Sequence, residues 1–517
     1  MKTIICMTAL VLSPLPATAA ESISVKYSWE DARTGEVATD HKTTFVPEAQ
    51  QGPAWSDPRL PRTLLILDMG KAMVRHLEAW NKGHCRIEPA RPVPCPMPGA
   101  DVIWPPRCPV PVPCGEYQHV AAELEKDIEE FSSRLDAMDD DRDIRETLDL
   151  MRRLADNMKT NVPYGPDPRI EADYGGVPGS GAAVRTPGGG GGAGVTTGGA
   201  QDFGLVRKLI NDGRVPGAGA LVMEGYLSTF DLSLSGQACD QLLCVSPAIA
   251  RDDDSGTMTV QLAMGSSIDA ASFRRRPLNL AIVLDISGSM SASDQTGRSR
   301  LEWAKDALRK TVAELNEGDL LAIELFDTRA ETLLAPTPVT DPDAILALVA
   351  PLQTRGSTNL EEGLRRGFRH VAAHHSPERE SRVILISDAG LNTGETNPDT
   401  ILELVERAAA GGTGLTAIGI GQNFKQGFID KISQSRGGNY IFVHSGAGLY
   451  DYFNGFDFLV TPVAYDFKAT MELEGIDAKL RAVYGLPGDV DPAKNLLNVQ
   501  TLFLSHRGGA IILEYER

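Results

Sequence analysis

The chain has 517 residues, a formal net charge of −19 and an apolar fraction of 42%. At about 150 residues per domain, this length predicts about three domains. The excess of 69 Asp and Glu over 50 Lys and Arg argues against a protein that coats nucleic acid or anionic lipid, because phosphate binding requires surplus Lys and Arg. An aromatic fraction of 6% also argues against stacking platforms for single strands. We therefore expect no nucleic-acid partner.

Residues 1–20 have the features of a secretory signal peptide, because Lys2 is followed by an apolar run over residues 4–12. The small residues Ala17 and Ala19 then supply a cleavage site. The apolar run is too short to span a bilayer of about 30 Å, and no later segment is long and uncharged enough to do so. We expect an exported product, periplasmic or secreted, without a transmembrane segment.

The cysteines predict disulfides. Removal of the signal peptide takes away Cys6 and leaves six, an even number that favours disulfides in an exported chain. Cys239 and Cys244 are predicted to pair with each other. The other four lie in a proline-rich segment that cannot form regular helix, since proline removes a backbone donor: Cys85, Cys95, Cys108 and Cys114. Zinc is the alternative, but the paired C-x2-C spacing is absent.

Residues 21–174 form the predicted N-terminal region. Its first part, residues 21–60, shows little periodicity. Apolar residues recur every three or four positions from Val120 to Met138 and again from Ile144 to Met158. This spacing predicts a helical hairpin.

A flexible linker is predicted over residues 175–201. Twelve glycines fall between Gly175 and Gly199, and the segment has too few apolar side chains to offset the entropy of ordering it. The alternative, a phosphate-binding loop, requires a G-x4-G-K-[ST] pattern that is absent here.

The C-terminal portion alternates strand-like and helical segments. Residues 278–284 form a nearly all-apolar run, typical of a central parallel strand buried on both faces. Further strand-like runs follow at residues 320–326, 383–387, 415–420 and 440–444. Helical stretches lie between the runs, at residues 301–315, 343–352, 359–373, 398–410 and 425–434. The alternation predicts an α/β fold with a doubly wound, mostly parallel sheet.

Five oxygen-bearing side chains lie at the ends of these elements, where a sheet of this kind binds its ligand. They are Asp285, Ser287, Ser289, Thr358 and Asp388. Two carboxylates and three hydroxyls suit a hard divalent cation, Mg²⁺ foremost, with Mn²⁺ or Ca²⁺ as alternatives. Two negative charges leave the ion short of a ligand, which an Asp or Glu of a partner can supply. Helix capping explains any one of these side chains, but not readily all five.

This ordered set resembles the metal-ion-dependent adhesion site of the von Willebrand factor type A (VWA) domain. The first three residues match the D-x-S-x-S motif of that family, the threonine its separate threonine, and the last aspartate its later aspartate. Ala389 stands where the family usually has glycine. The resemblance implies a VWA domain over residues 277–461, in which the two serines and the threonine contact the metal most directly.

The segments on both sides of this domain resemble the flanks of VWA domains in a group of bacterial exported proteins. The preceding flank, residues 202–276, contains strand-like runs near 219–232 and 257–264. The following flank, residues 462–517, alternates apolar and polar residues as half-buried strands do. We hypothesise one β-sandwich into which the VWA domain is inserted, beside a separate N-terminal region that is helical and disulfide-linked.

The leading functional hypothesis is an exported binding module, not an enzyme. Its protein ligand would present an Asp or Glu to the divalent cation. One alternative is an envelope or matrix scaffold without regulated ligand binding. The other is a metal-dependent hydrolase, which needs a general base near the ion, and no nucleophile motif such as G-x-S-x-G is recognisable in the sequence. Neither the identity of the partner nor the oligomeric state is predicted.

Two further clusters are interpreted as structural. His370 and His374 lie four residues apart on a predicted helix, but we interpret them as a solvated helix end rather than a second metal site. The acidic run at 252–254 lacks the pattern of a calcium loop and is interpreted as a solvated turn.

Overall fold

A computed structural model of the chain describes residues 21–48, 53–82, 117–138, 141–160, 193–197, 199–200, 203–217, 220–236, 239–269, 272–293, 297–388, 397–420, 434–443, 456–486 and 490–517. Four predicted features lie outside these residues: the signal peptide, the cysteine-rich segment 85–114, the linker over residues 175–192 and the helix over residues 425–433.

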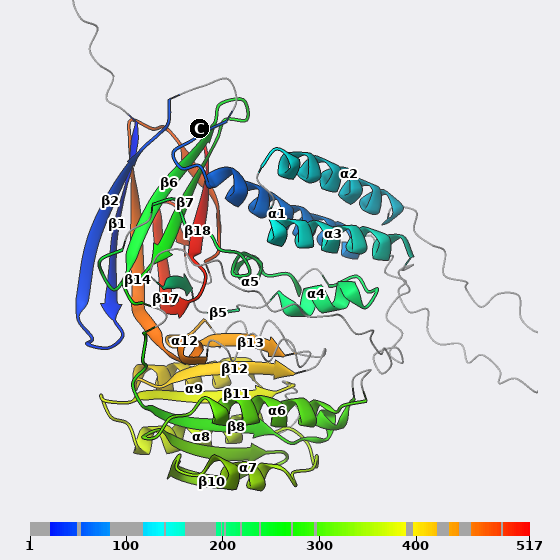
Figure 1. Ribbon diagram of the computed structural model, residues 1–517, viewed down its shortest axis with the longest axis vertical. Helices are drawn as coiled ribbons and strands as arrows, with labels where there is room; N and C mark the ends of the chain where they lie inside the picture. The colour runs from blue at the N-terminus through cyan, green and yellow to red at the C-terminus, as the bar shows by residue number, and fades with distance from the viewer. Residues whose placement is uncertain are drawn as a thin grey trace, which may run out of the picture.

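The described residues form two sheets, of which the larger has eleven strands (Figure 1). These are β1 (Ser22–Asp31), β2 (Val37–Phe45), β3 (Ala54–Trp55), β4 (Gly194–Thr197), β6 (Cys244–Asp252), β7 (Thr257–Gly265), β14 (Pro462–Glu474), β15 (Lys479–Tyr484), β16 (Val490–Asp491), β17 (Leu496–Ser505) and β18 (Gly509–Glu516). The main path runs β15-β18-β7-β4-β17-β14-β1-β2, while β6 pairs with β3 and β7, and β16 pairs with β17.

Strands from both flanks of the predicted VWA domain lie in this one sheet. The preceding strand β7 pairs with the following strand β18 along its whole length, in an antiparallel register from Met264 opposite Gly509 to Thr257 opposite Glu516. Their apolar side chains share a core, to which Val260 and Leu513 contribute. The two flanks therefore fold together, which is the arrangement that the insertion hypothesis requires.

The N-terminal region is not separate from this sheet, which corrects the sequence prediction. β1 pairs with β14 on one side and with β2 on the other. Four alternate residues of β1 are buried in the core, which is the period expected of a half-buried strand: Ile23, Val25, Tyr27 and Trp29. The sequence carried this alternation, but the prediction of little periodicity over residues 21–60 missed it.

The predicted linker ends earlier than residue 201. Residues 194–197 form β4, which pairs with β17 in the larger sheet, and Val195 and Thr197 are buried there. The chain then enters the smaller sheet at β5 (Gly199–Ala200). The β-branched residues of this segment suit a strand, and the glycine count of the whole segment concealed them.

The preceding flank differs from its prediction at residues 219–232. A five-residue helix, α5 (Met223–Leu227), lies there, and Tyr226 is buried in a helical core instead of a strand pair.

The predicted disulfide between Cys239 and Cys244 is confirmed, with a Cα–Cα distance of 5.6 Å.

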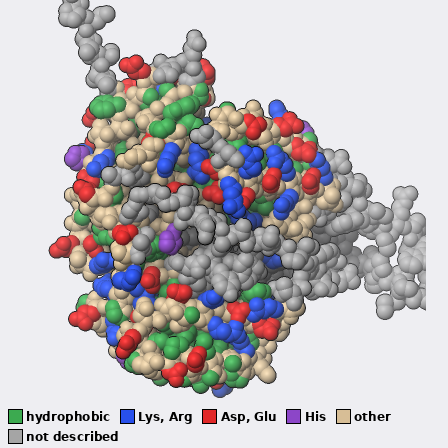
Figure 2. Space-filling view, in the orientation of Figure 1, with side chains coloured by type: hydrophobic (Ala, Val, Ile, Leu, Met, Phe, Trp, Pro, Cys, Tyr) green, Lys and Arg blue, Asp and Glu red, His purple; other side chains and the backbone are tan. Residues whose placement is uncertain are grey.

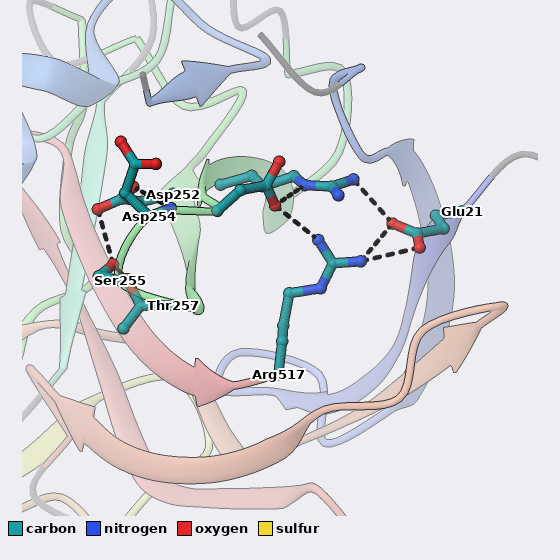
Figure 3. A network of polar contacts seen from close by, with 8 residues as sticks. Glu21, Asp252, Asp254, Ser255, Thr257 and Arg517 are labelled. Carbon is teal, nitrogen blue, oxygen red and sulfur yellow. Dashed lines mark hydrogen bonds and ion pairs between the residues drawn. The ribbon is translucent and has the colours of Figure 1, made fainter. Parts of the chain in front are cut away.

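The acidic run at 252–254 forms a turn between β6 and β7 (Figure 3). Asp252 accepts hydrogen bonds from the Ser255 hydroxyl at 2.6 Å and from the Asp254 backbone at 3.1 Å. Close by, the Arg517 guanidinium binds Glu21 at 2.8 Å, so that the end of β18 is tied to the start of β1. The side chains of Asp252 and Glu21 are therefore paired with groups of the same chain.

Helices pack against the larger sheet. They are α1 (Leu60–Lys82), α2 (Tyr117–Asp136), α3 (Arg142–Thr160) and α4 (Gly204–Asn211). The predicted hairpin corresponds to α2 and α3, which pack on α1 and share a core that includes Ile512 of β18. On the face shown in Figure 2, acidic and basic side chains are mixed over this helical region. The net acidic charge therefore does not gather there into a patch of one sign.

The smaller sheet is the predicted α/β sheet. Its remaining strands are β8 (Leu278–Asp285), β9 (Leu320–Phe326), β10 (Ala330–Pro338), β11 (Glu380–Ser387), β12 (Gly414–Ile420) and β13 (Asn439–Val443). Their order is β10-β9-β8-β11-β12-β13-β5, and all neighbours are parallel except β10 and β9. In Figure 1, β10 lies at the edge of this sheet that is farther from the larger sheet, and β13 lies on the side toward it, with β5 beyond β13. The antiparallel edge strand β10 was not predicted.

Two apolar cores cover the two faces of this sheet, as expected for a doubly wound fold. The helices are α6 (Arg300–Ala313), α7 (Pro342–Val349), α8 (Leu360–Ala373), α9 (Pro398–Ala410) and α12 (Phe456–Val460). β8 begins one residue after the predicted domain limit of 277, and β14 begins one residue after 461. None of the helices in the described residues is long and apolar enough to cross a membrane.

Candidate metal centre

Parallel pairing places two of the predicted carboxylates side by side. β8 and β11 are neighbours, with Leu284 opposite Ile386. Asp285 is the last residue of β8, and Asp388 directly follows β11. Both side chains therefore stand at the carboxyl edge of the smaller sheet, where parallel strands bind ligands.

Asp285 is fully buried and accepts two hydrogen bonds. The Ser287 backbone donates to Oδ1 at 2.8 Å, and the Ser387 hydroxyl donates to Oδ2 at 2.6 Å. The chain then turns into a short 3-10 helix, Gly288–Ser291, which brings the hydroxyl of Ser289 to 3.0 Å from that of Ser287. Ser287 is buried, whereas Ser289 is exposed.

Burial raises the pKa of Asp285 from 3.8 to about 6. Hydrogen bonds from Ser287 and Ser387 oppose this rise, and the nearby Asp388 carboxylate adds to it. A buried carboxylate beside another carboxylate is stabilised by a cation, since the cation offsets both the lost hydration and the repulsion.

The loop that carries Thr358 is joined by backbone hydrogen bonds to the loop that follows β8. The Arg355 backbone donates to the Ile286 carbonyl at 2.7 Å, and the Gly288 backbone donates to the Gly356 carbonyl at 3.1 Å. Gly356 has a φ of +66°, and a Cβ there would lie 2.7 Å from the Thr328 hydroxyl, so glycine is needed. Thr358, the residue after the next, is 1% exposed.

Asp388 is 3% exposed, and its two oxygens differ. Oδ2 is 2.6 Å from Nη1 of Arg300, the first residue of α6. Oδ1 is buried and has no hydrogen-bond donor within the described residues. A buried acceptor without a donor is costly, so it marks a position for a cation or another donor.

Asp285, Ser287, Ser289 and Asp388 lie at one edge of one sheet, and the loop that carries Thr358 is hydrogen-bonded to the loop of the two serines. The structure adds Arg300 and Ser387 to this edge. The sequence prediction missed both, although Ser387 directly precedes Asp388. No group of three or more His, Cys, Asp or Glu suited to a metal occurs in the described part of the chain. A metal at this edge would therefore need hydroxyl oxygens as well as carboxylates as ligands, a set that suits a hard cation.

His370 does not form the solvated helix end that the sequence predicts. Its Nε2 lies 2.5 Å from the carboxylate of Glu324, a fully buried residue of β9. His374 is exposed, and its ring contacts the carbonyl of His370 at 3.1 Å. His370 therefore contributes a part-buried hydrogen bond to the packing of α8 on the sheet.

Residues 280–391 match the sequence profile of the von Willebrand factor type A domain. The chain contains a VWA domain. The match covers β8 to β11 and both aspartates of the candidate centre, and β12 and β13 continue the same sheet beyond it.

The following relatives match only part of the chain. Inter-alpha-trypsin inhibitor heavy chain H3 of Homo sapiens is 35% identical over 166 residues, which are 30% of this chain and 18% of that protein. An uncharacterized protein of Synechocystis sp. is 29% identical over 195 residues, 37% of this chain and 44% of that protein. The solved structure "von Willebrand factor type A from Catenulispora acidiphila" has a TM-score of 0.35 at 17% identity and covers 50% of this chain and 60% of its own. The chain spans less than half of either curated relative.

Proposed function

We propose that the chain is an exported, non-enzymatic binding module whose VWA domain holds a protein ligand through a divalent cation. The observation that carries this proposal is the pair of buried carboxylates at the carboxyl edge, one of which keeps an oxygen without a donor within the described residues. The signal-like residues 1–20 support export.

The cation would be held by the five side chains predicted from the sequence. Mg²⁺ suits this set best, because it prefers oxygen ligands and keeps several waters or ligand oxygens in its shell. When bound, the ion would attract an Asp or Glu of a partner. The chain's own contribution is to fix Asp285 by two hydrogen bonds and to place two serine hydroxyls 3.0 Å apart beside it.

The experiment is an affinity capture from native envelope extract, with Mg²⁺ or EDTA in the buffer. The baits are the wild-type chain, Asp285→Ala and the matched control Asp477→Ala, which removes an exposed carboxylate from a turn of the larger sheet. We expect wild type and the control to retain the same partner in Mg²⁺ and to lose it in EDTA, and Asp285→Ala to retain none.

Each alternative function has its own outcome in this experiment. Partner capture that survives EDTA and Asp285→Ala would refute the proposal and favour a scaffold without regulated ligand binding. Metal-dependent turnover by the purified chain on a panel of ester, phosphate and peptide substrates would favour a hydrolase.

A further inference from the structure

Arg300 brings a positive charge into the candidate metal centre. Its Nη1 lies 2.6 Å from Oδ2 of Asp388 and 3.4 Å from the Ser289 carbonyl, and its side chain is 17% exposed. The start of α6 fixes this position. Ser299 and Glu302 form a reciprocal cap there, and the Arg300 backbone donates to the Ala292 carbonyl at 2.9 Å.

The charges of the centre are then unequal. The carboxylates of Asp285 and Asp388 contribute two negative charges, and the guanidinium of Arg300 contributes one positive charge. Adding a divalent cation gives the centre a net charge of about +1, and adding a carboxylate from a partner returns it to about zero. Since charges interact strongly in a site largely shielded from water, binding of the metal alone is less favourable than binding of the metal together with a carboxylate.

The geometry allows Asp388 to contact the Arg300 guanidinium and a metal ion at the same time. Arg300 holds Oδ2, and Oδ1, which has no donor within the described residues, is left for the metal. Both contacts of Arg300 use the same nitrogen, Nη1. A guanidinium has five donors in a planar fork that fits a carboxylate, so Arg300 can hold Asp388 and an incoming carboxylate together.

We propose that Arg300 is the second cation of the binding site: it weakens binding of the metal alone, and it binds the carboxylate of the partner together with the metal. Metal and carboxylate therefore bind cooperatively. This inference rests on the proposed function, since it describes how the same centre selects an acidic ligand. Arg300 acts here as a specificity residue.

The test is calorimetric titration of the full exported chain with Mn²⁺, in sodium chloride and in sodium acetate of equal ionic strength. Acetate is the carboxylate probe. We expect acetate to raise the Mn²⁺ affinity of the wild-type chain about tenfold, a coupling of ordinary size. Arg300→Gln should bind Mn²⁺ alone about tenfold more tightly than wild type and gain less than about threefold from acetate.

Two further variants separate charge from geometry. Arg300→Lys keeps the charge but loses the fork, so it should bind Mn²⁺ alone as weakly as wild type and gain less from acetate. Arg298→Gln is the matched control, because Arg298 pairs with Asp306 and stacks on Trp303. It should match wild type in both buffers.

The outcomes distinguish this inference from the proposed function. Equal Mn²⁺ affinities and equal acetate gains in wild type and Arg300→Gln would overturn the role of Arg300, as would weaker Mn²⁺ binding by a folded Arg300→Gln. Absence of Mn²⁺ binding by the wild-type chain, or unchanged binding by Asp285→Ala, would overturn the proposed metal centre itself. Thermal unfolding in EDTA checks that each variant is folded.

Discussion

Buried carboxylates lie at both ends of the strands of the VWA sheet, and the two ends treat them differently. At the amino end, Asp319 receives two hydrogen bonds from the buried Arg275 guanidinium, at 2.9 and 2.7 Å, and two from backbone N–H groups. At the carboxyl end, Asp285 receives hydrogen bonds from two neutral donors, and Asp388 keeps one oxygen without a donor within the described residues.

The amino end also joins the two sheets. Arg276 donates to the carbonyl of Ala32 at 3.4 Å in the β1–β2 turn and to Glu380 at 3.2 Å at the start of β11. Arg436, just before β13, pairs with Glu30 of β1. Burial raises the pKa of Glu380, while Arg382 and Arg276 oppose the rise. The arginines at this end balance the carboxylates, and the charges there serve the fold.

The difference teaches how to recognise the binding end. A buried charge that is fully paired stabilises an arrangement of chain segments, and removing its partner is costly. A buried carboxylate with too few donors costs stability until a ligand supplies the missing charge. Excess negative charge in a protected site is therefore the physical mark of the carboxyl end.

The largest expected effect is a loss of stability when the pairing at the amino end of the strands is removed. Arg275→Met leaves Asp319 buried without its guanidinium, so the free energy of unfolding should fall by about 3–5 kcal/mol. Urea unfolding should give the same loss in Mg²⁺ and in EDTA. The control Arg365→Met removes an exposed pair with Glu361 on α8 and should change stability by less than about 0.5 kcal/mol. Equal effects of the two variants would contradict the comparison.

The next effect concerns the carboxyl end. Mg²⁺ at about 100 times its dissociation constant should stabilise the wild-type chain by about 2.7 kcal/mol, because it binds only the folded state. Asp285→Ala should lose this gain and keep nearly wild-type stability in EDTA, since removal of a poorly paired buried charge offsets the lost hydrogen bonds. Differential scanning calorimetry measures both. A Mg²⁺-dependent gain in Asp285→Ala would refute the site.

Acidification should weaken metal binding. The pKa of Asp285 is raised from 3.8 to about 6. Between these two pH values, the folded chain without metal therefore keeps a proton on Asp285 that the unfolded chain has released. This raised pKa stabilises the metal-free fold below about pH 4, and the contribution is lost as the pH rises through about 6. Metal binding requires the ionised carboxylate and should weaken about tenfold per pH unit below about 6. Mn²⁺ titrations at several pH values measure this, and a flat profile between pH 5 and 7 would contradict it.

The smallest expected effect tests Ser289 as a ligand of the metal. Ser289 is exposed and supplies one neutral hydroxyl, so Ser289→Ala should weaken Mn²⁺ binding by about 1.5 kcal/mol, or about tenfold. Its stability in EDTA should stay within about 0.5 kcal/mol of wild type. Ser291→Ala, whose hydroxyl donates to the Gly288 carbonyl, is the matched control and should leave affinity unchanged. An equal loss in both serine variants would assign the effect to the loop instead of a ligand.

The smaller sheet was predictable because each of its parallel strands is an apolar run between turns and helices. β8 was predicted within one residue of its observed length. The sheet edges were harder. β10 is half exposed and β5 has two small residues, so neither carries a strong apolar run. β4 was hidden by the glycine content around it.

The sequence could point to the oxygen-bearing residues of the candidate site, but not to the positive charge that Arg300 brings there. The D-x-S-x-S spacing and the two later residues follow strand and helix ends, so the topology brings them to one edge. Arg300 was invisible to this reasoning, because an arginine at the start of a predicted helix has no pattern that points to Asp388. Only the packing of α6 against β8 and β12 of the sheet shows that the guanidinium of Arg300 reaches Asp388.

The central claim is that Asp285 and Asp388 hold a divalent cation at the carboxyl end of the VWA sheet. Calorimetric titration of Mg²⁺ into the full-length chain at pH 7.5, with Asp285→Ala in parallel, tests it most directly. The account predicts one site in the wild-type chain and no saturable binding in the variant. Equal binding by both chains, or no binding by the folded wild-type chain, would contradict it.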